Sequence, residues 1–375
     1  MDATAMDRAL LAAVRARRPL IDHTVRFINA HPELAHEEHI CSAHLQHTFD
    51  TLGLDVEAGL AGMETGFRAT LQGGRPGRSV GIVALFDAVA SVPETGGFAA
   101  VHSCGHGQIS AGVVGALAAL ATVRSELAGR VVVMGCPADE IHAPGTVAHG
   151  SGKMLSAAAG AWDDIDAALY AHPEPVDTAW SRTAWMRRDT ARIAGTRLLD
   201  DAASQPVLAS VVAAVNAAGS HPRASVMLEH LTLDGDVEEG GGLVARARFL
   251  IWSTDEAGLT SLADQLRAAL PAVWSEGRAV PGIVADPFVT QTVFDALRAA
   301  GRTPDEEPGP LPFATDFGSV THRVPGSLVG VGRPGGWAFH TPLGEQQFAS
   351  DEGIAAATDI AEVLALATVR LTTAR

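Results

Sequence analysis

Short apolar runs rich in valine and isoleucine alternate with longer segments of helical periodicity, and this alternation limits the folds open to the chain. The runs lie at Val80–Leu85, Val131–Met134, Ala167–Tyr170 and Leu328–Val331. Helical patterns separate the first three runs, at Ile109–Leu127 and Met154–Ala161. Strands that are apolar along their whole length are typical of a sheet covered on both faces. The alternation therefore predicts an α/β domain with a mostly parallel, doubly wound sheet.

A different pattern occupies the middle of the chain. Helical periodicity at Pro206–Ala218 is followed by two strand-like runs, Ala224–Leu233 and Leu243–Trp252, around an acidic glycine-rich turn, and then by a helix at Glu256–Leu270. This order predicts a small α+β domain with an antiparallel sheet. We expect an α/β catalytic domain of residues 1–186 and 284–375, interrupted by an inserted domain of residues 187–283.

The N-terminal residues Ala3–Leu54 have helical spacing, which is broken at His31-Pro32-Glu33. Two helices are predicted here. Glu33, Glu37 and Glu38 are expected on a solvated helix face.

Charge and cysteine content narrow the class of partner and the compartment. The 27 Lys and Arg residues against 43 Asp and Glu residues give a net charge of −16, which repels nucleic acids and anionic membranes. No apolar stretch approaches the roughly 18 residues of a membrane span. Three cysteines are too few for a disulfide framework, and the N-terminus lacks a signal sequence, so a cytoplasmic protein is expected. The single lysine, Lys153, follows a glycine-rich segment that lacks the Ser/Thr of a phosphate loop, and is expected at the surface.

Metal-binding and acid–base residue types stand in separate segments, most of them directly after a predicted strand. These residues are Cys104 and His106 before a helix, Asp139 and Glu140 after the second run, His172 at the end of the third, and His340 beyond the fourth. Thiolate, imidazole and carboxylate groups are ligands of borderline cations, and a second carboxylate beside a ligand could deprotonate a water. Each segment also has an ordinary interpretation as a buried cysteine, a capping carboxylate or a loop histidine.

The carboxyl ends of parallel strands meet at one edge of an open sheet, where ligands gather. We therefore expect Cys104, His106, Glu140, His172 and His340 to be near one another. With 15 histidines in the chain, coincidental placement stays open at this point.

A set of motifs in fixed order resembles the M-20 metallopeptidases, and within them amidohydrolases similar to aminoacylases, auxin-conjugate hydrolases and aminobenzoyl-glutamate hydrolases. The motifs are His31-Pro32-Glu33-Leu34 with Glu37-Glu38, Phe86-Asp87-Ala88, Ser103-Cys104-Gly105-His106, Pro137-Ala138-Asp139-Glu140, Gly160-Ala161-Trp162-Asp163-Asp164 leading to Ala171-His172-Pro173, Thr315-Asp316-Phe317-Gly318 and Phe339-His340-Thr341-Pro342.

The resemblance implies a metal-dependent amidohydrolase that cleaves a small N-acyl amino acid, dipeptide or related amide through a metal-activated water. It places Cys104, His106, Glu140, His172 and His340 at the ligands of one or two divalent ions, Asp139 at the catalytic carboxylate, and Asp87 where it would orient a ligating histidine. The thiolate favours zinc, and manganese, cobalt or nickel also suit such a mixed donor set. The resemblance further implies a homodimer formed through the inserted lid domain, with His230 as a candidate for binding substrate.

Three departures from the family pattern keep alternatives open. Asp139 replaces the usual glutamate, Gly107 stands where Asp or Asn is common, and Glu239-Gly240-Gly241-Gly242 replaces an Asn-Ile-Pro-like lid segment. An aspartate oxygen lies about 1 Å short of a glutamate oxygen, and a displacement of that size can cost about a hundredfold in rate. The chain could therefore be a diverged member with another acyl-transfer or ring-forming reaction, or a metal-binding pseudoenzyme.

Overall fold

The computed structural model describes residues 2–92, 97, 99–197, 204–221, 223–236, 242–311 and 313–374. The chain divides into two compact units. The first unit comprises Met1–Ser181, Ile283–Gly309 and Ser319–Arg375, and the second comprises Arg182–Gly282 and Pro310–Gly318. None of the helices in the described part of the chain combines the length and apolar character needed to span a membrane.

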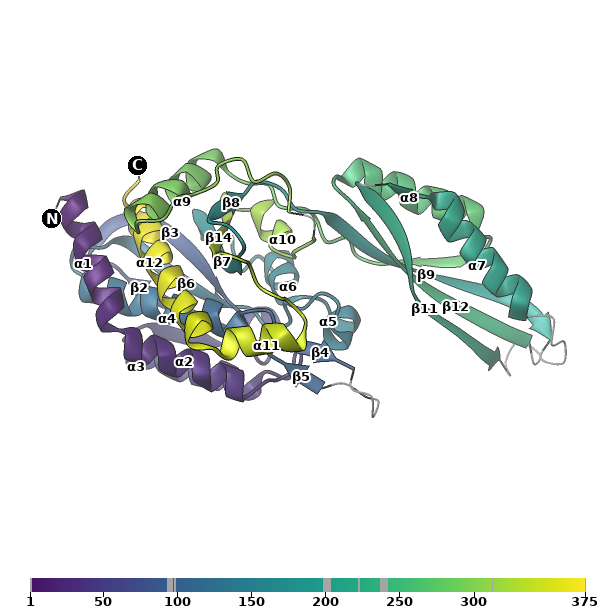
Figure 1. The fold of residues 1–375 in the computed structure, drawn as a ribbon, viewed down its shortest axis with the longest axis horizontal. Coiled ribbons are helices and arrows are strands. Elements are labelled where there is room, and N and C mark those ends of the chain that lie inside the picture. The colour runs from purple at the N-terminus through teal and green to yellow at the C-terminus, as the bar shows by residue number, and fades with distance from the viewer. Residues whose placement is uncertain are drawn as a thin grey trace. The chain divides into compact units, whose positions relative to one another are not determined.

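A seven-stranded sheet forms the centre of the first unit, in the order β1-β2-β6-β3-β7-β14-β8 (Figure 1). The strands are β1 (Asp55–Ala58), β2 (Phe67–Gln72), β3 (Arg75–Ala84), β6 (Ala128–Gly135), β7 (Ala167–Glu174), β8 (Thr178–Trp180) and β14 (Gly326–Gly332). Strands β6, β3, β7 and β14 are mutually parallel, and β1, β2 and β8 add antiparallel edges. The predicted α/β fold with a mostly parallel sheet is confirmed. The edge strands were not predicted, because they are short or lack a continuous apolar run.

One face of this sheet is covered by helices whose apolar residues share a single core. These helices are α1 (Ala3–Ala16), α2 (Arg18–Ala30), α3 (His39–Thr51), α4 (His106–Thr122), α9 (Pro287–Ala299) and α12 (Asp351–Thr373). Helix α4 is buried along almost its whole length. Its Gly112 and Gly115 permit close packing, since a Cβ there would lie 2.4 Å from Ile360 and 2.5 Å from Ile21. This packing fixes the start of α4, where His106 is located.

The opposite face is covered by the segment around α6 (Gly152–Ala158). The fully buried ring of Trp162 lies against Gly81 of β3, where an added Cβ would be 2.9 Å from the ring. Trp162 Nε1 donates a hydrogen bond to Ser156 Oγ at 3.0 Å. The sheet is thus covered on both faces, as its apolar central strands require.

The remaining elements of the first unit are short. They are η1 (Leu60–Gly62), β4 (Val89–Ser91), β5 (Ala99–Val101), α5 (Pro144–His149), α10 (Gly318–Thr321) and α11 (Pro342–Ala349). One of them, α10, begins at the last residue of the second unit.

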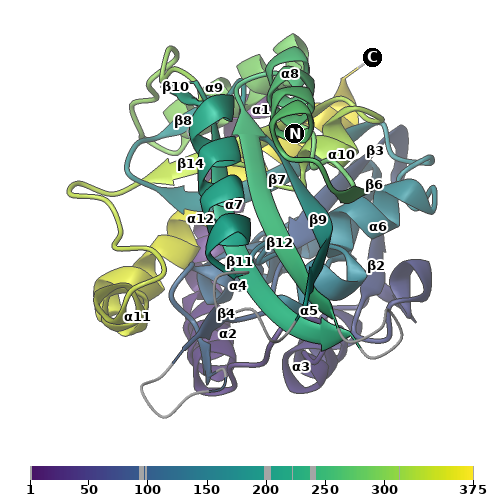
Figure 2. The same ribbon diagram turned by 90° about the vertical axis from the view of Figure 1, so that its right-hand side faces the viewer.

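The second unit has a five-stranded antiparallel sheet in the order β10-β11-β12-β9-β13. Its strands are β9 (Trp185–Arg197), β10 (Ser220–His221), β11 (Ala224–Asp236), β12 (Gly242–Ser253) and β13 (Val273–Glu276). Helices α7 (Ser204–Ala218) and α8 (Glu256–Ala269) lie on one face of this sheet and share its core (Figures 1 and 2). Residues 239–241 of the glycine-rich stretch lie outside the described residues.

A buried carboxylate holds part of the second unit together. Asp189 of β9 is fully buried and pairs with Arg187 at 2.8 Å and with Arg267 of α8 at 2.9 Å. It also accepts a hydrogen bond from Gly277 N at 3.1 Å. The cluster links β9 to helix α8 and to the end of the edge strand β13.

Candidate metal centre

The parallel strands of the first unit carry the candidate residues to one edge of the sheet. Asp87 follows β3, Asp139 and Glu140 follow β6, His172 lies near the end of β7, and His340 follows β14. From β3 the chain continues to β6 on one side and then to β7 on the other. Such a reversal of strand order opens a crevice at the carboxyl ends of the strands. The structure brings all of these residues together with Cys104 and His106.

The Cys104 thiol lies among the histidines. Its Sγ is 3.2 Å from His340 Nε2 and 3.8 Å from His172 Nε2. One donor atom from each of Cys104, Glu140 and His340 lies within 4.8 Å of the others. Burial opposes ionisation, but hydrogen bonds with the histidines, His106 first among them, hold the pKa of the Cys104 thiol well below its usual range. The thiolate is the form of cysteine that binds metals.

His106 is oriented by Asp87. Its Nδ1 lies 2.7 Å from the Asp87 carbonyl oxygen and 3.0 Å from Asp87 Oδ1. A carbonyl can only accept, so the hydrogen sits on Nδ1 and the lone pair of Nε2 is left for a cation. Asp87 Oδ2 also accepts a hydrogen bond from Glu140 N at 2.9 Å, which ties His106 to the loop after β6.

The buried donor atoms fit a bound cation. Among the described residues, neither His106 Nε2 nor Glu140 Oε1 forms a well-aligned hydrogen bond, although both atoms are buried. The two atoms are 3.6 Å apart, and Glu140 Oε2 is 3.5 Å from His340 Nε2. Burial and the nearby Cys104 sulfur raise the pKa of Glu140 well above its usual range. Groups that are costly to bury without a partner, and that face one another, are typical of a metal site.

Glu174 is a site residue that none of the sequence motifs indicated. Its Oε1 lies 3.0 Å from His172 Nδ1, and its side chain is buried. Both residues are on β7 and, two positions apart, project from the same face of the strand. That spacing was a usable signal. Glu174 leaves His172 Nε2 directed at Cys104, as a carboxylate behind a metal-binding histidine does.

The loop after β6 is held in an uncommon backbone conformation by Glu38. Ala138 has φ 55°, in the left-handed region, and its N–H donates to Glu38 Oε1 at 2.9 Å. Thr65 Oγ1 donates to Glu38 Oε2 at 2.8 Å, and His36 N to Oε1 at 2.9 Å. The expectation of a solvated Glu38 is wrong, because the side chain is fully buried beneath this loop. Burial, with Asp87 nearby, raises the pKa of Glu38 to about 7.

The other two glutamates of that motif behave differently. Glu37 is exposed, as expected. Glu33 is half-buried and caps α3, accepting hydrogen bonds from Ile40 N at 2.8 Å and Cys41 N at 2.9 Å.

Asp139 is paired with the only lysine of the chain. Lys153 of α6 is 0% exposed, so its expected surface position is wrong, and its ammonium contacts Asp139 Oδ1. Asp139 Oδ2 lies 3.3 Å from His106 Nε2 and accepts from Tyr170 Oη at 3.5 Å. Although burial favours the neutral acid, Lys153 and His106 hold the pKa of Asp139 below its usual range. One oxygen therefore faces the lysine and the other faces the histidine cluster.

His340 forms the open side of the cluster. Its side chain is 46% exposed, whereas that of His106 is 1% exposed. The residue has φ 58°, and its N–H donates to Ser103 O at 3.0 Å, which fixes the loop after β14 against the Cys104 loop. Non-glycine residues with positive φ are uncommon and tend to occur at functional sites.

His230 belongs to the second unit. It lies on β11 next to a bulge between Leu228 and His230, and its side chain is exposed. Its assignment to substrate binding stays a prediction.

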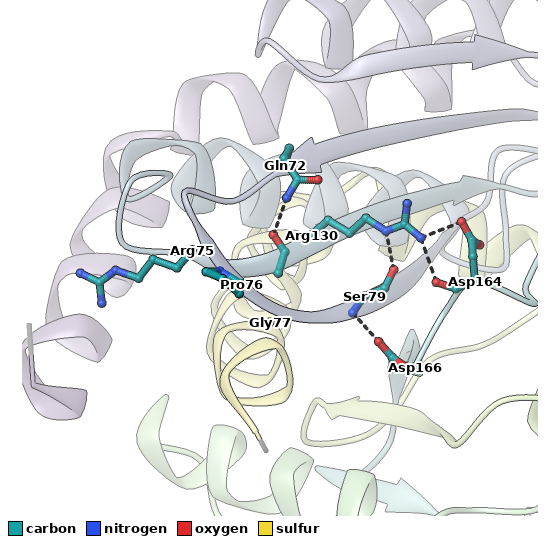
Figure 3. A pocket seen from close by; sticks show the side chains of 9 residues that line it. Gln72, Arg75, Pro76, Gly77, Ser79, Arg130, Asp164 and Asp166 are labelled. Atoms are coloured by element: carbon teal, nitrogen blue, oxygen red, sulfur yellow. Dashed lines mark hydrogen bonds and ion pairs between the residues drawn. The ribbon is translucent and has the colours of Figure 1, made fainter.

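The opposite edge of the first unit's sheet has a polar cavity of about 370 Å³ (Figure 3). Arg130 crosses it, and donates to Ser79 Oγ at 2.9 Å and to Asp164 Oδ2 at 2.7 Å. Asp166 accepts from Ser79 N at 2.8 Å. These residues lie at the amino ends of the parallel strands, and their charges are matched within the cavity.

Comparison with known proteins agrees with the geometry. Over 158 residues the chain is 30% identical to one of the subunits of the p-aminobenzoyl-glutamate hydrolase of Escherichia coli strain K12, covering 38% of this chain and 30% of that protein. It is 31% identical over 163 residues to Xaa-Arg dipeptidase of Mus musculus, covering 41% and 35%. The matched segments thus span about a third of these curated relatives.

Two solved structures share the whole fold. The Bacillus subtilis YXEP protein, described as a dinuclear metal binding peptidase from the M20 family, aligns with a TM-score of 0.72 at 18% identity, covering 96% of this chain and 99% of that one. The aminobenzoyl-glutamate utilization protein of Klebsiella pneumoniae aligns with a TM-score of 0.70 at 15% identity, covering 98% and 100%.

A family model matches residues 86–367, a segment that contains every candidate residue from Asp87 to His340. The resemblance drawn from the sequence motifs is confirmed: the chain belongs to peptidase family M20/M25/M40.

Proposed function

We propose that the protein is a metal-dependent amidohydrolase that cleaves the amide bond of a small N-acyl amino acid, dipeptide or related amide. The observation that carries this proposal is the convergence of Cys104, Glu140 and His340, whose donor atoms lie within 4.8 Å of one another, beside a second carboxylate, Asp139. The names of two matched relatives support it, since one is a hydrolase of p-aminobenzoyl-glutamate and the other an Xaa-Arg dipeptidase.

The residues that would hold one or two divalent ions are Cys104, His106, Glu140, His172 and His340. A thiolate among imidazoles favours zinc, and the description of the Bacillus subtilis structure as dinuclear supports a pair of ions. Divalent ions at such a site polarise a scissile carbonyl and lower the pKa of water.

Asp139 is the proposed base. Its Oδ1 is occupied by Lys153, so Oδ2 is the oxygen that faces the cluster. Asp139 accepts the proton of the attacking water on Oδ2 and returns it to the amide nitrogen as the amine leaves. His340, on the open side, borders the path by which substrate enters.

A homodimer formed through the second unit is the proposed assembly. Within the described residues, the outer edge of β11 is paired only with the two-residue strand β10. Met227 and Leu233 of β11 and Leu208 and Val212 of α7 are exposed. A long open edge with apolar neighbours favours pairing with another chain.

The three cysteines are thiols rather than disulfides, which supports the cytoplasm as the compartment.

Metal analysis of the purified protein and its variants tests the proposal. Cys104→Ala and His172→Ala should lose bound metal. Asp139→Ala should keep it and lose about 10²- to 10⁴-fold in turnover on a panel of N-acyl amino acids and dipeptides. If Glu140→Ala kept both its metal and its activity, the proposal would be wrong.

Asp139 gives a reason to test a second candidate function, a diverged reaction of another acyl-transfer or ring-forming kind. Gain of simple peptidase activity in Asp139→Glu would count against it. Stoichiometric metal with no turnover over the whole panel would instead identify a pseudoenzyme.

A further inference from the structure

Two adjacent carboxylates approach the same atom at similar distances. Asp139 Oδ2 lies 3.3 Å from His106 Nε2, and Glu140 Oε1 lies 3.6 Å from it. Carboxylate oxygens of aspartate and glutamate are equally suitable metal ligands. The proposed function nevertheless needs one of them as a ligand and the other as a base, so the structure must distinguish them.

The two side chains differ in what holds their second oxygen. Glu140 directs its other oxygen, Oε2, at His340 Nε2, 3.5 Å away, so both of its oxygens face histidines of the cluster. Asp139 directs its other oxygen, Oδ1, at the ammonium of Lys153. Glu140 therefore faces the histidine cluster with both of its oxygens, whereas Asp139 faces it with Oδ2 alone.

Lys153 is built into this position. It is 0% exposed, on a helix packed beneath the loop, and the ring of Tyr170 covers its Nζ at 4.9 Å. Tyr170 Oη also approaches Asp139 Oδ2, at 3.5 Å. A buried ammonium is stable only when it is paired, which makes its contact with Asp139 hard to give up. The remaining 26 basic residues of the chain are arginines, since 27 Lys and Arg residues include one lysine.

We propose that Lys153 is a positioning residue that keeps Asp139 out of the metal coordination sphere and so reserves it as the base. Its role as the base rests on the proposed function, whereas the restraint by Lys153 does not. Without the ammonium, Asp139 is free to rotate toward the cation beside His106 and become an additional ligand.

The test uses Co²⁺ as a spectroscopic probe in the full-length protein. Absorption by Co²⁺ weakens as its coordination number rises above tetrahedral, so an added carboxylate is visible without any turnover. Lys153→Met keeps an unbranched side chain of similar length and removes the charge. We expect weaker absorption in Lys153→Met, and the wild-type spectrum again in Lys153→Met/Asp139→Asn, because an amide is a poor ligand.

Turnover gives an independent readout. In Lys153→Met, kcat should fall roughly a hundredfold with KM little changed, because the base is displaced while the pocket stays intact. Thermal denaturation first shows that each variant is folded. If Lys153→Met is not folded, the second variant is Lys153→Gln, which keeps a polar group in the buried space. It should show the same spectral change.

Arg130→Met is the matched control. It removes a cation from a partly buried pair with Asp164 at the opposite edge of the sheet (Figure 3). We expect its cobalt spectrum and turnover to match the wild type.

The outcomes separate the two proposals. A wild-type spectrum in folded Lys153→Met or Lys153→Gln would overturn the role of Lys153 and leave the amidohydrolase proposal standing. A wild type that binds Co²⁺ but hydrolyses nothing would overturn the proposed function, while the spectra would still decide the role of Lys153. A wild type that binds no Co²⁺ would overturn both.

Discussion

Replacing Glu38 with glutamine should change how the stability of the protein depends on pH. Glu38 is fully buried, and its pKa is raised from 4.5 to about 7, first by burial and then by Asp87. Glutamine has the shape of the protonated acid. Its amide oxygen can still accept from Ala138 and His36, and its amide group can donate to the hydroxyl of Thr65.

The magnitude follows from linkage between proton binding and folding. Because the folded pKa lies above the unfolded one, the native state binds the proton more tightly. The stabilisation that protonated Glu38 gives the folded state is complete below about pH 4.5 and is lost as the pH rises through about 7. The difference between 4.5 and about 7, at 1.36 kcal/mol per pH unit, is about 3 kcal/mol. Glu38→Gln has no such loss.

Denaturant unfolding of both proteins at about pH 5 and about pH 8, with chelator present, measures the effect. The free energy of unfolding of Glu38→Gln minus that of the wild type should rise by about 2.5 kcal/mol between the two pH values, because a part of the loss has already occurred at about pH 5. Taking this difference removes the contributions of all other titrating groups. A difference that is the same at both pH values would show that Glu38 is ionised throughout, and would refute the reasoning.

Three further changes have defined outcomes. Glu174→Ala should weaken metal binding about 10- to 100-fold by chelator competition, because His172, a proposed metal ligand, loses the carboxylate that orients it, and unchanged affinity would contradict this role. Asp189→Ala removes a fully buried carboxylate that holds the half-buried Arg187 and Arg267 and should cost about 1.5–3 kcal/mol in denaturant unfolding, whereas Asp264→Ala, which removes an exposed carboxylate, should cost under about 1 kcal/mol. Gly105→Ala should lower the melting temperature, since Gly105 has φ 88° and an added Cβ would lie 2.5 Å from Pro173; an unchanged value would show that the loop adjusts freely.

The elements predicted correctly are those whose signal is local. The four buried parallel strands are visible in the sequence as continuous apolar runs. Because the carboxyl ends of such strands meet at one edge of the sheet, the sequence also predicted that Cys104, Glu140 and His340 lie near one another, as they do in the structure. Strand β9 was not predicted, because its arginines interrupt the apolar pattern. In the structure Arg187 pairs with Asp189 and Arg188 pairs with Glu229.

The residues that hold the site were harder to predict, because their roles depend on contacts between distant segments. Glu38 looks like any glutamate on a polar helix face, and only the fold places it beneath Ala138, one hundred positions further along the chain. Lysine is one of the residue types that are almost never fully buried unless paired. The burial of Lys153 follows from the meeting of α6, β7 and the loop after β6, which no local pattern encodes.

The contact between Cys104 and His340 has a consequence for chain topology. Sγ and Nε2 are 3.2 Å apart, yet the chain between them includes the whole of the second unit. A cation shared by these two side chains would act as a cross-link closing that long loop, and a cross-link stabilises a fold by restricting the unfolded chain. Removal of the metal would then remove this cross-link and the stabilisation that it gives. The ions proposed for the reaction would thus also hold together the two parts of the first unit that the second unit separates.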